Sequence, residues 1–339
     1  MGSPLRFVVV GATAAEAERA WSAVDAEIEA VEQALSRYRE TSDLTRANRA
    51  AGAAPASGAA PASGAAPGDG WTAVDRRLRH ALAAAVRADR LTSGWFDARV
   101  LADLERLGSI GVPRAGNEFP GGPSARRARA GDDTRWLEVD GRRSRVRLAV
   151  PVDLGGIGKG LALRWAWRRA QRTLPPQPGI GALLEAGGDV VVGGPAPGGG
   201  PWSVGIEDPY REGEHLAVVG VAGGAVATSS VAVNRWIAPD GRLVHHLIDP
   251  ATGEPGGPGL LAVTVAASDP AWAEVWSKTL FLTGRVAIGP VARARGLAAW
   301  WVTVDGTLEM TPAARVLTTW EPMPAAEPER ARVAVGPVG

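Results

Sequence analysis

The spacing of apolar side chains predicts helices and strands that follow one another in mixed order. Apolar residues recur every three to four positions in Ala14–Leu35, in 71–89 and in 270–282, which predicts three amphipathic helices. Turn dipeptides at Asp140-Gly141 and Asp305-Gly306 each join two short apolar runs into a predicted hairpin. Because strands and helices do not alternate regularly, the pattern favours an α+β fold. Further strands are expected at 5–10, 182–186, 189–192, 202–206, 216–221 and 261–267.

Two segments lack such a pattern. Residues 50–70 contain a repeated Ala-Ala-Pro-Ala-Ser-Gly unit, and residues 325–339 show no apolar period. Segments of this kind cannot bury an apolar face, so we expect a flexible inserted loop and a loose C-terminal tail. The length of 339 residues allows one elaborated domain or two smaller ones, and we interpret 1–324 as one domain.

The overall composition argues against several classes of function. A formal net charge of +1 is not that of a general nucleic-acid binder. The absence of cysteine excludes disulfides, thiolate metal sites and thiol nucleophiles. No run is long and apolar enough to span a bilayer, and residues 1–10 lack the basic and apolar regions of a signal peptide. We therefore expect a cytoplasmic protein.

Residues 152–160 read Val-Asp-Leu-Gly-Gly-Ile-Gly-Lys-Gly and precede a helix-like segment. Glycines let backbone N–H groups approach a ligand closely, and the start of a helix favours an anion such as phosphate. A tight strand-to-helix turn explains the same spacing equally well, so both interpretations stay open here. Two familiar phosphate loops are excluded, because Asp153 and Gly160 break the Walker pattern and Leu161 breaks the dinucleotide fingerprint.

Lysine is almost absent from this chain. Only two of its 37 basic residues are lysines, Lys159 and Lys278, and the abundance of Ala, Gly, Pro and Arg indicates a bias that replaces lysine wherever arginine serves. Arginine is a planar fork, whereas lysine is a compact point charge. The two lysines therefore mark positions that are expected to need an ammonium group.

Other clusters allow both structural and functional interpretations. His245 and His246 are adjacent on a predicted strand, so at most one faces a given site, and four histidines in all do not favour a His-rich metal centre. Trp95-Phe96 fits either the core or a wall against a planar ring. Four carboxylates would suit Mg²⁺ on a diphosphate, although each alone is more typical of a cap, a turn or the surface: Asp97, Asp153, Asp249 and Glu274.

Eight sequence blocks, taken in order, resemble the FAD:protein FMN transferase family, the ApbE type. The resemblance runs from the N-terminus to about residue 310 outside the Ala/Pro/Ser insert, and no single block would be specific. The blocks are Ser36-Arg-Tyr38 with Ser42 and Asn48, Ser-Gly-Trp-Phe-Asp at 93–97, the glycine loop at 152–160, Glu-Ala-Gly-Gly-Asp at 185–189, residues 202–209, Ala-Thr-Ser at 227–229, His-Leu-Ile-Asp-Pro-Ala-Thr-Gly at 246–253, and Ala-Glu-Val-Trp-Ser-Lys at 273–278 before Leu280-Phe281.

The resemblance implies an α+β fold of mixed, largely antiparallel sheets with packed helices. It also implies a transferase that moves the FMN half of FAD onto a Ser or Thr hydroxyl of an acceptor flavoprotein and releases AMP. At matching positions it implies FAD contacts for Met1, Tyr38, Trp95, Phe96, Asp97, Asp153, Lys159 and Ile248. It implies a metal site at Gly156, Glu274 and Ser277, and a place near the transferring phosphate for Thr228, Ser229, His246 and Asp249.

The sequence departs from the family pattern in two blocks. The family usually has Asp where this chain has Glu274, Thr where it has Lys278, and Gly where it has Ser230. Glutamate can ligate a metal but an ammonium cannot, so we count Lys278 among the catalytic residues and expect reduced or lost Mg²⁺ dependence. Two alternatives to the transferase stay open, an FAD diphosphate hydrolase giving FMN and AMP, and a non-catalytic FAD-binding protein.

Overall fold

A seven-stranded antiparallel sheet forms the centre of the computed structural model, which describes residues 4–53, 70–109, 136–232 and 234–321. The mixed, largely antiparallel α+β fold expected from the sequence is confirmed. Along the sheet the strand order is β1-β5-β6-β9-β14-β15-β16. The bounds are β1 Leu5–Val10, β5 Gly181–Ala186, β6 Asp189–Gly193, β9 Gly224–Ser230, β14 Leu260–Ala267, β15 Ala298–Thr303 and β16 Leu308–Met310.

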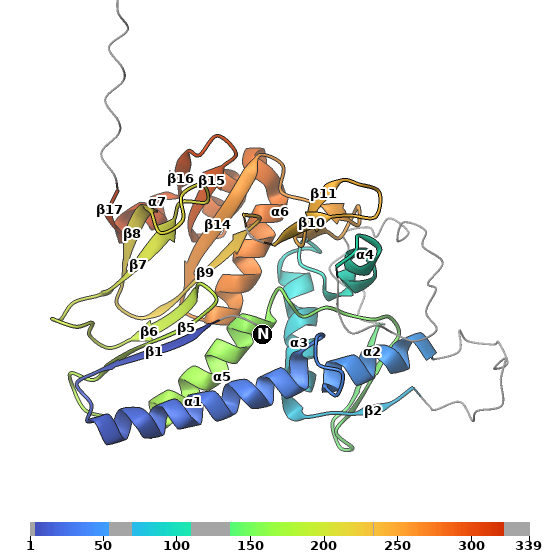
Figure 1. The fold of residues 1–339 in the computed structure, drawn as a ribbon, viewed down its shortest axis with the longest axis horizontal. Helices are drawn as coiled ribbons and strands as arrows, with labels where there is room; N and C mark the ends of the chain where they lie inside the picture. Colours follow the sequence, from blue (N-terminus) through green and yellow to red (C-terminus); the bar gives the residue numbers. More distant parts are fainter. Residues whose placement is uncertain (1–3, 54–69, 110–135, 233, 322–339) are drawn as a thin grey trace, which may run out of the picture.

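Three helices pack against one face of this sheet (Figure 1), namely α1 Ala14–Leu35, α5 Gly158–Thr173 and α6 Pro270–Ala294. Small apolar side chains on these helices allow a close approach to the strands. Ala166 and Ala170 of α5, for example, lie in the same buried cluster as Leu184 of β5. The other face packs against a three-stranded sheet of order β17-β8-β7, with Trp300 fully buried between the two sheets. The bounds are β7 Trp202–Glu207, β8 His215–Val221, α7 Pro312–Leu317 and β17 Thr318–Trp320.

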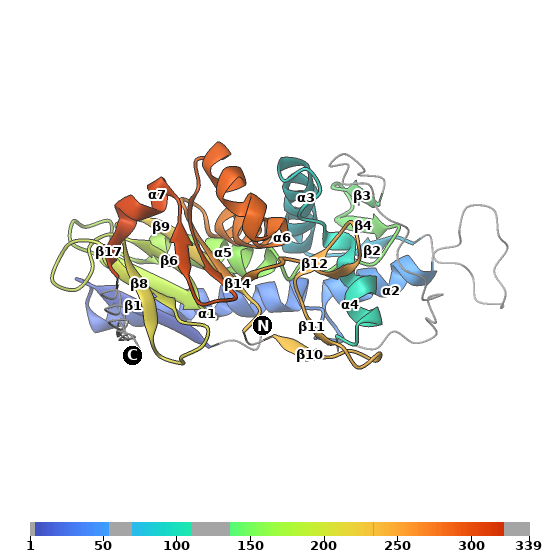
Figure 2. The same cartoon turned by 90° about the horizontal axis from the view of Figure 1, so that it is seen from above.

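A second, mainly helical part adjoins the sheet and shares its long helix α1, which extends through both parts (Figure 1). It contains α2 Asp43–Ala53, β2 Thr72–Ala73, α3 Arg76–Leu91, a 3₁₀ turn at Ala98–Val100, α4 Leu101–Arg106, β3 Leu137–Asp140 and β4 Arg145–Leu148. Two small hairpins complete the described chain, β10 Arg235–Ile237 with β11 Leu243–His245, and β12 Ile248–Asp249 with β13 Glu254–Pro255. Figure 2 shows β10 and β11 beside α4, against which they bury Val244 and Ala238.

Some predicted boundaries are corrected. The helix predicted over 71–89 begins only at Arg76, because Asp75 caps it and Thr72 pairs with β4. The helix predicted over 270–282 continues to Ala294, interrupted at Gly284, whose φ of 74° no helix residue adopts. Helix α2 extends to Ala53, so the first residues of the predicted 50–70 loop are helical.

The predicted insert beyond Ala53 and the predicted tail at 325–339 lie outside the described residues, apart from Gly70. Within the described ranges, none of the helices combines the length and the apolar character that crossing a membrane requires.

Candidate active site

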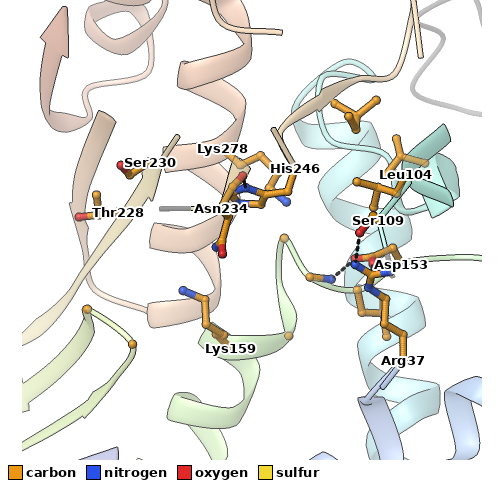
Figure 3. A pocket seen from close by; sticks show the side chains of 18 of the residues that line it. Arg37, Leu104, Ser109, Asp153, Lys159, Thr228, Ser230, Asn234, His246 and Lys278 are labelled. Carbon is orange, nitrogen blue, oxygen red and sulfur yellow. Dashed lines mark hydrogen bonds and ion pairs between the residues drawn. The ribbon is translucent and has the colours of Figure 1, made fainter. Parts of the chain in front are cut away.

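A cavity of about 1070 Å³ lies between the central sheet and the helical part, and Figure 3 shows some of its lining. Its walls come from segments far apart in sequence: the turn after α1, the segment 95–97, the glycine loop, the end of β9, the β10 hairpin and α6. The structure brings together eleven of the predicted site residues on these walls: Tyr38, Trp95, Phe96, Asp97, Asp153, Gly156, Lys159, Thr228, His246, Ile248 and Lys278.

The glycine loop is anchored by residues from the helical part. The buried Asn48 amide accepts a hydrogen bond from the Val152 N–H and donates one to the Val152 carbonyl, both at 2.9 Å. The Asp153 N–H donates to the Ala98 carbonyl at 2.7 Å. These contacts fix the position at which the loop turns into α5.

Most N–H groups of this loop already have partners within the protein. Gly155 donates to the Asp153 carboxylate, Ile157 and Gly158 both donate to the Leu154 carbonyl, and Gly160 donates to Glu274 Oε2 at 2.7 Å. The interpretation as a tight strand-to-helix turn is confirmed, and the interpretation as an anion-binding loop stays a prediction. Because most of the loop's N–H groups have partners within the protein, an anion bound here would be contacted mainly by side chains.

Asp153 forms an ion pair with Arg37, a contact that the sequence does not predict. Arg37 Nε is 2.8 Å from Asp153 Oδ2, and both side chains are largely buried. Arg37 Nη2 also donates to the Tyr38 hydroxyl at 2.6 Å and to the Ser109 hydroxyl at 2.9 Å, contacts drawn in part in Figure 3. Arg37 thus connects the glycine loop with Tyr38, which remains 61% exposed at the cavity rim.

Lys159, on the first turn of α5, is held by Asp189 at the start of β6. Lys159 Nζ is 2.7 Å from Asp189 Oδ2, and Asp189 Oδ1 accepts the N–H of Thr228 at 3.0 Å. Burial acts to lower the pKa of Lys159, but Asp189 and Glu274 outweigh it and raise that pKa above its usual value. Lys159 therefore stays charged at neutral pH.

Lys278 approaches the glycine loop from α6. A Cβ placed on Gly156 would lie 2.6 Å from Lys278 Nζ, so the absence of a side chain at this glycine makes room for the ammonium. Burial lowers the pKa of Lys278, while Asp153 and Glu274 act in the opposite direction. Glu274 itself is 4% exposed, and burial raises its pKa to about 7 against the effect of Lys159.

His246 lies on the cavity wall, and the adjacent His245 packs its ring edge-on against Phe281. His246 Nδ1 is 3.3 Å from the Asn234 carbonyl, which can only accept, so this nitrogen carries the proton and Nε2 is left as an acceptor. Burial, with a contribution from Lys278, lowers the pKa of His246 to about 4. The ring is therefore neutral at physiological pH, as a proton acceptor must be.

Strand alternation decides which hydroxyls reach the cavity. Thr228 and Ser230 line the cavity, whereas Ser229 points to the opposite side of β9, towards α6. Ser229 Oγ donates to Ser277 Oγ at 2.9 Å, and Ser277 Oγ donates to the Glu274 carbonyl. The predicted catalytic role of Ser229 and the predicted metal role of Ser277 are thus not supported by their positions.

All four predicted carboxylates have partners within the protein. Asp249, predicted to be near the phosphate, does not line the cavity, because its carboxylate accepts the Ala251 N–H in the β12–β13 turn. Asp97 lines the cavity but also caps the 3₁₀ turn and pairs with Arg99 Nε at 2.9 Å. Glu274 lies behind the glycine loop rather than on the cavity wall. Met1 is outside the described residues.

Several lining residues were missed. Arg37 lies between Ser36 and Tyr38 in one of the eight family-like blocks, and its place beside Tyr38 is the signal that the sequence contains. Asn234 and Ile237 reach the rim through the β10 hairpin, and Ser109 through the end of α4. Nothing in the sequence near these three residues indicates the cavity, because the fold alone brings them to it.

Comparisons with known proteins agree with this architecture. The family model described as the ApbE family matches residues 1–301. Proteins named FAD:protein FMN transferase from Klebsiella pneumoniae and Salmonella typhimurium are each 29% identical over 313 residues, covering 90% of this chain and 83% of theirs. The crystal structure of the ApbE protein from Thermotoga maritima is 26% identical with a TM-score of 0.73, covering 93% of this chain and 96% of its own.

Proposed function

The chain belongs to the ApbE family, and from this premise we propose that it is an FAD:protein FMN transferase, an enzyme that moves FMN from FAD onto a Ser or Thr hydroxyl of an acceptor protein. The observation that carries the proposal is the cavity. A single chamber large enough for a dinucleotide is lined by the glycine loop, by two ammonium groups and by a neutral histidine. The relatives' shared name favours the transferase over the hydrolase and the non-catalytic binder.

The reaction makes defined demands on the site. The acceptor hydroxyl oxygen forms a bond to the phosphorus of the FMN half, the P–O bond to the bridging oxygen breaks, and AMP leaves with that oxygen and its electron pair. The hydroxyl proton must pass to a base, and the phosphate charge must be neutralised.

Each demand has a candidate residue on the cavity wall. His246 would accept the proton at Nε2, since its Nδ1 is engaged by the Asn234 carbonyl. Lys159 would neutralise phosphate oxygens, with Asp189 holding it in place. Thr228 Oγ1 lies 2.9 Å from Thr264 Oγ1, and one of these two hydroxyls remains able to donate to a phosphate.

The aromatic walls would hold the rings of FAD. Tyr38, Trp95 and Phe96 lie on the side of the cavity formed by the helical part, where Ile248 closes the wall. Asp153 would contact FAD from the glycine loop and would do so as part of its ion pair with Arg37. The predicted contact of Met1 with the flavin stays a prediction, as does the cytoplasmic location.

A divalent cation does not fit the residues predicted to hold it. The Ser277 hydroxyl is turned towards Ser229, Glu274 is already engaged by the Gly160 N–H, and the Lys278 side chain occupies the space beside Gly156. Among the residues described here, no three Asp, Glu, His or Cys side chains gather in a metal-binding arrangement. The proposed reaction therefore assigns no role to Mg²⁺ at this position.

The proposal is tested by incubating the full chain with FAD, with and without a protein acceptor of the Klebsiella pneumoniae relative. We expect AMP release that depends on the acceptor, and an acceptor mass increased by one FMN less one water. AMP and FMN formed equally well without an acceptor would show the hydrolase instead, and tightly bound but unchanged FAD would show a binding protein.

A further inference from the structure

The Lys278 side chain reaches the cavity from α6 and ends beside Gly156. It makes no hydrogen bond or ion pair with any residue in the described ranges, although it lies within electrostatic range of Asp153 and Glu274. Its side chain is partly accessible and lines the cavity next to His246 (Figure 3). A cation held in a protein interior without a contacting anion is unfavourable unless a ligand supplies one.

Two other cations that line the cavity differ from Lys278 in this respect. Arg37 is paired with Asp153 at 2.8 Å, and Lys159 is paired with Asp189 at 2.7 Å. Each of them therefore shares its charge with a carboxylate before any ligand arrives. Lys278 keeps its charge available for a bound anion.

The contact with Gly156 favours a compact cation at this position. The Gly156 backbone lies so close to the end of the Lys278 side chain that one added carbon would be 2.6 Å from Nζ and 2.9 Å from Cε. An ammonium is more compact than a planar guanidinium and suits this close approach to the backbone. Lysine occurs only twice among the 37 basic residues of the chain, and one of the two stands here.

We propose that Lys278 is a built-in counter-charge for the FAD diphosphate, which occupies the place of a divalent cation beside Gly156 and Glu274. This inference rests on the proposed function for the identity of the anion. FAD then binds in this cavity without a metal ion, its diphosphate contacted by Lys278 from α6 and by Lys159 from α5. The site selects ligands that carry phosphate, because an uncharged flavin leaves Lys278 without its anion.

The first experiment measures flavin binding in EDTA by quenching of flavin fluorescence, for the wild-type chain and for K278M. Methionine has nearly the same length but no charge. We expect K278M to bind FAD about 10- to 100-fold more weakly, the range for loss of a charge-assisted hydrogen bond. Riboflavin, which lacks phosphate, should bind both proteins equally. Unchanged FAD affinity in K278M, or an equal loss for riboflavin, would overturn the proposal.

The second experiment measures metal binding directly, with Mn²⁺ detected by electron paramagnetic resonance in the presence of FAD. The wild-type complex should bind no Mn²⁺ at this site. K278T, which places a hydroxyl beside the Gly156 carbonyl and the Glu274 carboxylate, should gain one Mn²⁺, and K278T/E274Q should lose it again. One Mn²⁺ in the wild-type complex, or none in K278T, would contradict the assignment.

These binding measurements need no turnover, so they separate the two proposals. A chain that releases no AMP under any condition would refute the transferase, yet the fluorescence and Mn²⁺ results would still decide the role of Lys278. A chain that transfers FMN only with Mg²⁺ and binds one Mn²⁺ would support the transferase and refute the built-in charge.

Discussion

The backbones of α5 and α6 approach each other closely at Gly160, and adding one methyl group there tests how the site is assembled. In Gly160→Ala the new Cβ would lie 2.5 Å from both the Ala271 Cα and the Pro270 carbonyl oxygen. These are backbone atoms and cannot rotate away. The matched control is Gly158→Ala, in the same helical turn, where the nearest atom would be the Leu154 Cβ at 4.0 Å.

The two substitutions are expected to change the free energy of unfolding in opposite directions. Relieving the contact at Gly160 requires the two helices to separate by about 1 Å, and overpacking of this kind costs about 1–3 kcal/mol. For Gly160→Ala the loss of stability should lie near the upper end of this range, because the new methyl group clashes with backbone atoms. Gly158→Ala meets no clash and restricts the unfolded chain, which stabilises by about 0.4–1 kcal/mol. The two variants should therefore differ by about 3 kcal/mol in the free energy of unfolding.

Urea denaturation followed by the fluorescence of the 13 tryptophans measures this difference. Flavin binding should respond as well, since α6 carries Glu274 and Lys278 and a shifted α6 moves both away from the glycine loop. Gly160→Ala with wild-type stability and FAD affinity would refute the close crossing of α5 and α6. An equal loss in Gly158→Ala would show that any substitution in this turn is harmful, whatever the space.

Two further predictions concern the loop and the histidines. Asn48→Ala removes both hydrogen bonds to Val152 and leaves buried backbone groups without partners. It should therefore lower the free energy of unfolding, measured by urea titration, by about 2–4 kcal/mol. Asn48→Asp keeps the hydrogen-bond acceptor and should lose less stability in the same titration. Burial lowers the pKa of His245 and His246 to about 4, below the value near 6.5 expected in the unfolded chain, so the unfolded state takes up more protons between these values. Stability should therefore fall as the pH is lowered from about 6.5 to about 4, by at most ~1.4 kcal/mol per pH unit for each histidine. The variant His246→Asn should show a smaller dependence of stability on pH. A stability that does not change over this pH range would contradict the burial of both rings.

The sequence predicted the family and the fold class better than the contacts of individual side chains. The scarcity of lysine directed attention to Lys159 and Lys278, and the structure places both on one cavity. The glycine loop was located correctly as the turn into α5. The place of the turn depends on local spacing and the choice of the two lysines on residue type, while the roles expected of the lysines stay predictions.

Features that depend on tertiary contacts could not be predicted. The ion pair of Arg37 with Asp153 joins segments separated by more than a hundred residues. The direction in which Ser229 points depends on the register of β9, which pairs Ser229 with Val263 of β14. The helix at Arg76 begins later than its apolar period suggests, because a capping carboxylate and a strand pairing override the pattern.

The alternation of hydroxyls along β9 has a consequence for how this segment can change. Thr228 and Ser230 line the cavity, while Ser229 packs against α6. Exchanging one small hydroxyl residue for another preserves this division. Inserting or deleting a single residue before position 228 would reverse it, so that the hydroxyl that now packs against α6 would face the cavity and the two that line the cavity would face the helix. The length of this strand is therefore more tightly constrained than the identity of its residues.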